Sequence, residues 1–422
     1  MRRKLILLTA TATFALPLNA AAQSLDETIA ASMANSPTLA AARAREDAAD
    51  AAVKQARAER MPQASVEGQI GTGRLNPKGY FGLSADDVTP RSAQATVELP
   101  IFTGGKIGSA VRQAKGGAEI AELATYSTML DLRLQVVRSF TNALSAKEEV
   151  KSYSALQASL AEVLRQAKLS FNAGGATATD VAQAEARLAE AEAGLARAQG
   201  NLAAGMGRLE ALAGERIDPS GDLPPPPETP ADLDASVELA VLDNPQVEQA
   251  RRAADIAHAG VSAARAEYLP DVGLYAEAAS VRDQFFPGYT ADSASVGVRG
   301  RWTFFSGGRT GAKVTGAEAN ERAALADIRA AELEVRTAAI QSFEALRAAT
   351  LMRIAADKRV AATQEALRGT RLEVEVGAKP QLALLDAERE AIAARVAQID
   401  AAGQVLVAAY TLRAVTGMDG AP

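Results

Sequence analysis

FNAGGATATDVAQAEARL, residues 171–188, breaks a chain that otherwise reads as very long, alanine-rich helix. Gly174 and Gly175 supply the backbone freedom that a tight turn needs. Thr179 and Asp180 follow them, and small polar residues at the start of a helix accept hydrogen bonds from its free N–H groups. The stretch therefore predicts the tip of a helical hairpin.

The same sequence pattern occurs twice along the chain. Residues 24–49 (SLDETIAASMANSPTLAAARAREDAA) align with residues 232–257 (DLDASVELAVLDNPQVEQARRAADIA). Further on, residues 99–110 (LPIFTGGKIGSA) align with residues 302–313 (WTFFSGGRTGAK). Self-similarity of this kind indicates two copies of one structural unit.

The repeated pattern divides the chain into two structural repeats and shorter parts. The first repeat occupies residues 23–217 and the second occupies residues 231–417. Between them, residues 218–230 (DPSGDLPPPPETP) are expected to form a linker, because a run of prolines is stiff and extended. A ligand for a proline-binding domain is the alternative for this segment. Residues 418–422 are a short C-terminal tail.

Each repeat contains two expected strands followed by one long helix. The strand segments alternate apolar and polar residues, which is the period of a sheet with one polar face. The helical segments lack proline and carry apolar residues at steps of three and four, and each would be roughly 100 Å long at about 1.5 Å per residue. The strands are expected at about 63–72 and 91–102 and at about 270–281 and 294–305, and the long helices at about 106–172 and 309–376.

The N-terminus has the three-part pattern of a cleaved secretory signal. Basic residues at positions 2–4 precede an apolar run at 5–16, and small residues at 20–22 precede Gln23. We therefore expect a signal peptide over residues 1–22. A membrane anchor is the alternative, but the apolar run is too short to span a bilayer. No later segment is expected to be apolar for long enough to form a membrane helix.

Charge and composition exclude several classes of partner and site. The 422 residues carry a net charge of −6, and removing the three basic residues of the signal gives −9, which disfavours nucleic acid as a partner. Aromatic residues make up 4% of the chain, which is too few for several conventional cores. The chain has no cysteine, which excludes disulfides, metal–thiolate sites and a lipid attached to an N-terminal cysteine.

The expected strands have the length of membrane strands. A tilted strand of about 10 residues crosses an outer membrane, and aromatic residues such as Trp302 and Phe304 lie near one end, as in an interfacial girdle. A soluble sandwich with one wet face shows the same alternation and is the alternative. Four strands are too few to close a spanning barrel, since single chains need about eight. Assembly of several copies would close it.

The ordered set of elements resembles the TolC-type outer-membrane channel proteins of Gram-negative bacteria. The resemblance rests on two repeats of helix, two strands, long helix, tip and helix, with FNAGGATATDV at 171–181 and VEVGAKPQLALLDAER at 374–389 as the tips. It covers about residues 25–417. The fold that it implies is an α+β membrane protein. In it, a long antiparallel α-helical barrel is continuous with a trimeric 12-strand transmembrane β-barrel, to which each of three chains gives four strands.

The resemblance implies the outer-membrane channel-tunnel of a tripartite efflux pump or of a type I secretion system. Such a protein is a passive exit duct in the cell outer membrane and extends into the periplasm. The implied partners are two further copies of the chain in a homotrimer, a periplasmic adaptor (membrane fusion) protein, an inner-membrane transporter and outer-membrane lipid. Nucleic acid is not among them.

The resemblance also assigns residues to a periplasmic gate. Asp180 matches an acidic residue that holds the two hairpins together, and Lys379 matches the basic residue opposite it. Asp386 matches a carboxylate that, repeated by threefold symmetry, rings the lumen at its constriction and favours cations there. The sequence departs from the family pattern at Ala383, in place of a second acidic ring, and at Val374, where an aromatic residue is usual. For Asp180 and Lys379, an ordinary helix cap and a solvated lysine are the alternative.

The turns of the two hairpins are the contacts with the adaptor that the resemblance implies. A tight turn exposes backbone at the end of a helical rod, so the structural and the functional interpretation agree. The residues concerned are Gly174, Gly175, Gly377 and Ala378.

Two other functional classes fit the sequence less well. His258 is the only histidine and has no repeated acidic partner near it in the sequence, so a general base is disfavoured. We expect no catalytic residue, no cofactor and no metal site. A periplasmic coiled-coil adaptor or scaffold would explain the rods and the signal, but not the two strand pairs.

Overall fold

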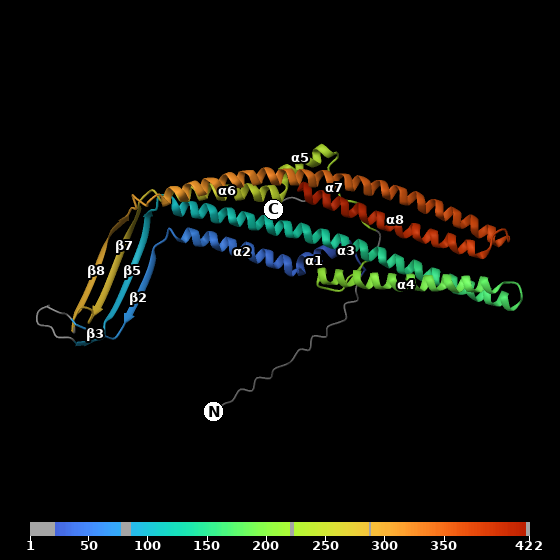
Figure 1. Cartoon of the computed structure of the whole chain (residues 1–422), viewed down its shortest axis with the longest axis horizontal. Helices are drawn as coiled ribbons and strands as arrows, with labels where there is room; N and C mark the ends of the chain where they lie inside the picture. Colours follow the sequence, from blue (N-terminus) through green and yellow to red (C-terminus); the bar gives the residue numbers. More distant parts are fainter. Residues whose placement is uncertain (1–21, 77–85, 220–222, 287, 419–422) are drawn as a thin grey trace, which may run out of the picture. The chain divides into compact units, whose positions relative to one another are not determined.

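The computed structural model describes residues 22–76, 86–219, 223–286 and 288–418 (Figure 1). Of the expected signal peptide, only Ala22 is among the described residues, and of the expected tail, only Met418 is. Residues 220–222 of the expected linker also lie outside them.

Eight helices account for most of the described chain. Alanine, the residue with the highest helix propensity, recurs throughout them. Their lengths occur in two matching series of 11, 22, 67 and 36 residues. The helices are α1 (Leu25–Asn35), α2 (Pro37–Ala58), α3 (Lys106–Asn172), α4 (Ala178–Ala213), α5 (Leu233–Asp243), α6 (Pro245–Ala266), α7 (Arg309–Glu375) and α8 (Gln381–Thr416).

The long strands form one antiparallel sheet in the order β2-β5-β7-β8 (Figure 1). The pairing of β5 with β7 joins strands from the two halves of the chain, and β2 and β8 are the edges. Two short pairs accompany the sheet: β3 with β4 antiparallel, and β1 with β6 parallel. The strands are β1 (Ala22–Gln23), β2 (Gln63–Ile70), β3 (Gly73–Leu75), β4 (Asp86–Val88), β5 (Arg91–Phe102), β6 (Asp218–Pro219), β7 (Asp271–Arg282) and β8 (Thr290–Arg301).

The strand register gives the sheet one polar and one apolar face. Side chains alternate along a strand, and residues directly opposite each other share a face. The apolar face carries mainly valine, alanine, leucine and isoleucine, and its Val66 and Val296 are 82% and 83% exposed. An apolar surface of this kind marks a membrane or protein contact. The hydrogen-bonding and charged residues of the polar face are Gln63, Ser65, Glu67, Gln69, Ser92, Gln94, Thr96, Glu98, Asp271, Tyr275, Glu277, Ser293, Ser295, Arg299 and Arg301.

The last strand of the sheet differs from the sequence-based expectation. The sequence predicts it at about 294–305, whereas β8 runs over Thr290–Arg301. The preceding turn explains the shift, because the Asp283 N–H donates to the Tyr289 carbonyl oxygen at 2.8 Å. Pairing with β7 therefore begins immediately after the turn.

Trp302 lies just beyond β8 instead of within it. Its indole N–H donates to the Tyr268 carbonyl oxygen at 3.0 Å, and its ring centroid is 6.3 Å from that of Phe304. The first strand, expected at about 63–72, ends at Ile70. The other expected strand and long-helix bounds differ from the structure by two residues or fewer.

The composition of α8 also departs from expectation. Residues 382–416 are long and apolar enough to pass for a membrane span, where no such segment was expected. Ala394, Ala409 and Leu412 of this helix are fully buried against the rest of the chain. Apolar residues in a packed helix give the same composition, so α8 alone is weak grounds for a spanning helix.

The chain divides into two compact units that do not follow the two repeats expected from the sequence. The first contains residues up to 36 with 131–228 and 344–411, and the second contains residues 37–130, 229–343 and from 412 onward. Each unit has its own apolar cluster. In the first unit the cluster is Leu156, Leu160, Ala191 and Leu385, and in the second it is Ala240, Val247, Ala331, Val335 and Ala339.

An asparagine holds the end of one helix in each unit. In the first unit, the Asn35 side-chain amide donates to the carbonyl oxygen of Ala213 at the end of α4, at 2.7 Å. In the second, Asn244 donates in the same way to Val415 near the end of α8, at 2.8 Å. The last carbonyl groups of a helix lack partners within it, so these bonds satisfy acceptors that would otherwise be free.

Candidate functional site

Glycines at both hairpin tips adopt the left-handed backbone that the turns require. The φ angle is 78° at Gly174 and 75° at Gly377, a region that favours glycine. The N–H groups of Gly175 and Ala378 donate back to the last turns of α3 and α7 at 2.8 and 2.7 Å. Both tips belong to the first unit and lie at the same end of it (Figure 1).

Asp180 caps the N-terminus of α4. Its carboxylate accepts hydrogen bonds from the N–H of Thr177 at 2.8 Å and from the Thr177 hydroxyl at 2.7 Å. The Asp180 N–H donates to the same hydroxyl at 3.2 Å, which completes a capping box. The bond from the Thr177 backbone, followed by that from its hydroxyl, lowers the pKa of Asp180. Within one chain, Asp180 therefore has the role of an ordinary helix cap.

The Asp180 cap predicts a pH-dependent hairpin. Because its folded-state pKa lies below the ordinary value of 3.8, the stabilisation is complete above that value and is lost as the pH falls through the folded-state pKa. We expect Asp180→Ala to speed amide hydrogen exchange at the start of α4 at neutral pH. After correction for intrinsic rates, variant and wild type should converge in acid. Mass spectrometry of the 177–184 peptide measures this, and equal exchange at neutral pH would contradict it.

Lys379 also has a local partner. Its Nζ lies 2.7 Å from a carboxylate oxygen of Glu373, in the last turn of α7, and both side chains are about half exposed. Within the part of the chain that the structure describes, no ion pair joins Lys379 to Asp180. The expected link between Asp180 and Lys379, which would hold the two hairpins together, stays a prediction.

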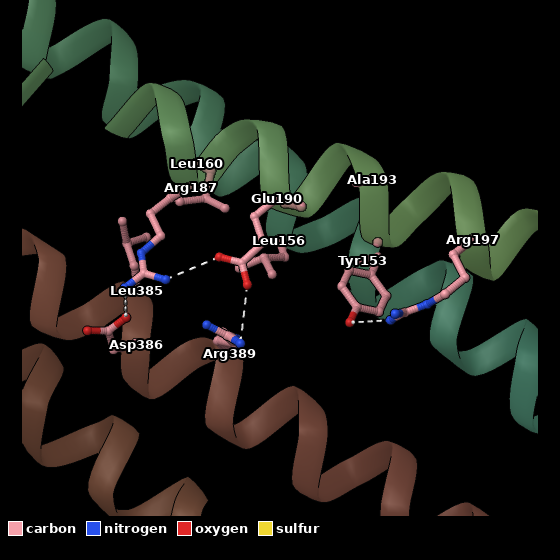
Figure 2. Close-up of a pocket in the computed structure, with 12 residues that line it drawn as sticks. Tyr153, Leu156, Leu160, Arg187, Glu190, Ala193, Arg197, Leu385, Asp386 and Arg389 are labelled. Carbon is pink, nitrogen blue, oxygen red and sulfur yellow. Dashed lines mark hydrogen bonds and ion pairs between the residues drawn. The ribbon is translucent and has the colours of Figure 1, made fainter. Parts of the chain in front are cut away.

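Asp386 belongs to a row of four charges between α4 and α8 (Figure 2). Its carboxylate lies 3.6 Å from the guanidinium group of Arg187. Arg187 lies 3.1 Å from Glu190, and Glu190 lies 3.2 Å from Arg389. We call these four residues the α4–α8 charge network. Two of its three contacts cross between the helices: Arg187 with Asp386, and Glu190 with Arg389.

The α4–α8 charge network is partly open to water. Its side chains are between 38% and 57% exposed. An exposed ion pair contributes about 0–1 kcal/mol, and salt weakens it. Each contact is therefore weak alone, and any strong effect requires that several act together.

An apolar layer lies beneath the α4–α8 charge network. Leu156 and Leu160 of α3, with Leu385 of α8, belong to the buried cluster of the first unit. Beside them the Tyr153 ring fills the space above Gly194, because a Cβ at Gly194 would lie 2.3 Å from the ring. The network and this layer enclose a cleft of about 330 Å³. Packing and charge together hold α4 against α8.

Sequence reasoning identified Asp386 but not its partners Arg187, Glu190 and Arg389. A signal was available, because opposite charges lie three residues apart on both helices, the spacing at which side chains are neighbours on a helix surface. Spacing within a helix does not reveal which other helix it faces. The contacts between α4 and α8 therefore required the structure.

Residues 22–76, 86–219, 223–286 and 288–418 contain no group of three or more metal-ligating side chains suited to hold an ion. The single histidine, His258, lies with its Nδ1 2.7 Å from a carboxylate oxygen of Glu321 on α7. The imidazole is 72% exposed.

Sequence comparison decides the family. The model of the outer membrane efflux protein family matches residues 28–215 and 237–418, which together make up most of the chain. The chain belongs to this family. As an outer membrane efflux protein, it is an outer-membrane channel of an efflux or secretion system, located in the outer membrane and extending into the periplasm. The alternative of a periplasmic adaptor or scaffold is not favoured.

Two relatives carry the two kinds of export in their names. The outer membrane efflux protein BepC of Brucella suis is 26% identical over 317 residues, which is 72% of this chain and 69% of BepC. The alkaline protease secretion protein AprF of Pseudomonas aeruginosa is 27% identical over 210 residues, which is 47% of this chain and 44% of AprF.

Solved structures show the same fold. The CmeC outer membrane channel of Campylobacter jejuni superimposes with a TM-score of 0.81 over 98% of this chain and 94% of CmeC, at 15% identity. This outer membrane efflux protein therefore has the same chain fold as the outer-membrane channel CmeC.

Proposed function

We propose that three copies of the chain form the passive exit duct of a tripartite efflux pump or a type I secretion system. The observation that carries this proposal is the unfinished sheet. Its edge strands β2 and β8 have no further long strand beside them among the described residues, and its apolar face is exposed. An open edge with an apolar face is not stable as an isolated sheet in water or lipid.

Three copies would complete the sheet as a barrel. Four strands from each of three chains give 12 strands, an even number above the minimum of about eight. In such a barrel β8 of one copy pairs with β2 of the next. The apolar face turns to lipid and the polar face lines a water-filled interior, which is the alternation of transmembrane barrels.

The helices would continue the barrel as an α-helical tunnel into the periplasm. The matching series of helix lengths supports two structural repeats, 23–217 and 231–417, each giving one long helix beside shorter ones. The linker at 218–230 then joins the repeats. A trimer built in this way is a conduit, and we assign no catalytic role to it.

The duct needs machinery in the inner membrane, because a passive channel supplies no energy. A periplasmic adaptor protein that contacts the tips Gly174, Gly175, Gly377 and Ala378, and an inner-membrane transporter behind it, would provide this. The name of BepC supports efflux and that of AprF supports secretion, so the proposal includes both kinds of export system. Outer-membrane lipid is the remaining partner, around the apolar face of the sheet.

We place the periplasmic gate at the hairpin end of the first unit, around Asp180, Lys379 and Asp386. Asp180 caps α4 through Thr177, and Lys379 pairs with Glu373 while about half exposed. A contact between copies would therefore compete with both local interactions. For Asp386, its contact with Arg187 supports a role in holding α4 to α8. In this proposal the α4–α8 charge network is a latch that must break before the tunnel widens.

The mass of the detergent-solubilised mature protein tests the assembly. Native mass spectrometry should give three times the mass of one chain, and planar bilayers that receive this species should show stepwise conductance. A water-soluble single chain with no conductance would overturn the proposal.

A further inference from the structure

A mixed-charge network lies on the polar face of the sheet, in the second unit. One guanidinium nitrogen of Arg299, on β8, lies 2.6 Å from a carboxylate oxygen of Glu98, on β5. The other lies 3.9 Å from Glu277, on β7 between them. The guanidinium carbon also lies 4.6 Å from the centre of the Tyr275 ring, within range of a cation–π contact. Three strands thus hold the one arginine in place.

A glycine makes room for this arrangement. Gly297 on β8 is directly opposite Tyr275, and a Cβ there would lie 3.0 Å from the tyrosine ring. The ring therefore lies across the glycine, beneath the guanidinium group of Arg299. The position of the arginine is built into the register of the sheet.

Carboxylates outnumber the arginine in this network. The Gln94 side-chain amide donates to Glu277 at 2.9 Å, and Glu67 on β2 is directly opposite Gln94. We call Glu67, Glu98, Glu277 and Arg299 the sheet charge belt. Its three carboxylates and one guanidinium group give a net charge of −2. The remaining charges of the polar face, Asp271 and Arg301, are directly opposite each other and cancel.

We propose that the sheet charge belt makes the barrel segment of the channel prefer cations, and that Arg299 sets how strong this preference is. The inference rests on the trimeric barrel proposed above, in which the polar face lines the lumen and three belts surround it. Fixed negative charge on the wall of a pore raises the local concentration of cations and lowers that of anions. The belt is separate from Asp386, which belongs to the first unit.

The reach of the belt depends on salt. The screening length is about 10 Å at 0.1 M and about 30 Å at 0.01 M, so the belt acts near the wall in the first case and across the lumen in the second. A substitution that removes one charge from each of the three copies should change the cation-to-anion permeability ratio by roughly twofold at about 0.1 M, by Coulomb's law in water with this screening. The change should grow as the salt is diluted.

Two opposite substitutions test the proposal in planar bilayers under a KCl gradient. Glu67→Gln removes a negative charge and should lower the ratio, whereas Arg299→Gln removes the positive charge and should raise it. Two controls keep the net charge: Arg299→Lys, and the exchange of Glu98→Arg with Arg299→Glu. Both should leave the ratio at the wild-type value.

The outcomes separate this inference from the proposed function. Stepwise conductance with the same permeability ratio in wild type, Glu67→Gln and Arg299→Gln would overturn the belt and leave the channel intact. A ratio that moves in the same direction in both variants would also overturn it. Purified wild type that gives no conductance would overturn the trimeric channel, and the belt with it.

Discussion

Removal of both arginines from the α4–α8 charge network, as Arg187→Ala with Arg389→Ala, is expected to raise the open probability of the channel about 100-fold. The double variant breaks both contacts between α4 and α8. At about 0.5 kcal/mol for each exposed pair, two contacts in each of three copies sum to about 3 kcal/mol, and about 1.4 kcal/mol is a factor of ten. Single-channel recording measures the effect directly.

A matched control for the double variant is Arg165→Ala. Arg165 pairs with Glu162 at 2.6 Å, but both residues lie on α3, so this contact does not join two helices. We expect Arg165→Ala to keep the wild-type open probability. Concentrated salt should bring wild type towards the double variant, since the screening length falls to about 3 Å at 1 M. An open probability unchanged in the double variant would rule out the network as a latch.

Gly417→Ala is expected to destabilise the protein by about 3 kcal/mol. Gly417 follows α8 with a φ of 68°, a left-handed backbone that costs other residues about 1–2 kcal/mol. A Cβ there would also lie 2.6 Å from the Asp243 carbonyl oxygen, so the backbone at the end of α5 must move. That movement strains the neighbouring hydrogen bond from Asn244 to Val415. Thermal unfolding followed by circular dichroism should show a lower midpoint.

A glycine within a helix provides the comparison. Gly316 lies in α7 with no atom within 4 Å of a Cβ placed on it, and its φ is not positive. Alanine is better than glycine inside a helix by about 0.5–1 kcal/mol, so Gly316→Ala should raise the midpoint slightly. Equal midpoints for the two variants would show that the end of α8 tolerates a side chain and that the contact with Asp243 is not restrictive.

Proline and glycine made much of the architecture predictable. Helix interiors exclude proline, and the prolines at 37 and 245 mark the first residues of α2 and α6. The double glycines at 104–105 and 307–308, all with positive φ, mark the change from strand to long helix. The end of β8 was not predictable in this way, because the alternation of apolar and polar residues continues through Trp302 and Phe304, beyond the last paired residue Arg301. The hydrogen bond between Asp283 and Tyr289, which fixes where pairing begins, cannot be read from that alternation.

The candidate site was less predictable than the fold. Asp180 follows Thr177 by three residues, the spacing of a capping box, so its role as a helix cap could be inferred from the sequence. The partner of Asp386 is almost 200 residues away along the chain, on α4. Helix periodicity gives the face on which a side chain lies, but the choice between neighbouring helices depends on packing. Charge contacts between helices therefore remain hidden until the helices are placed.

Trp302 is an intrinsic fluorescent probe of the membrane boundary that the proposed barrel would have. It is the only tryptophan of the chain, it is 61% exposed, and it sits just past the end of β8, held by the Tyr268 carbonyl group. In the proposed barrel, all indole fluorescence would therefore originate from a single depth, where the strands give way to the long helices. Quenching by brominated acyl chains would locate that depth without any label.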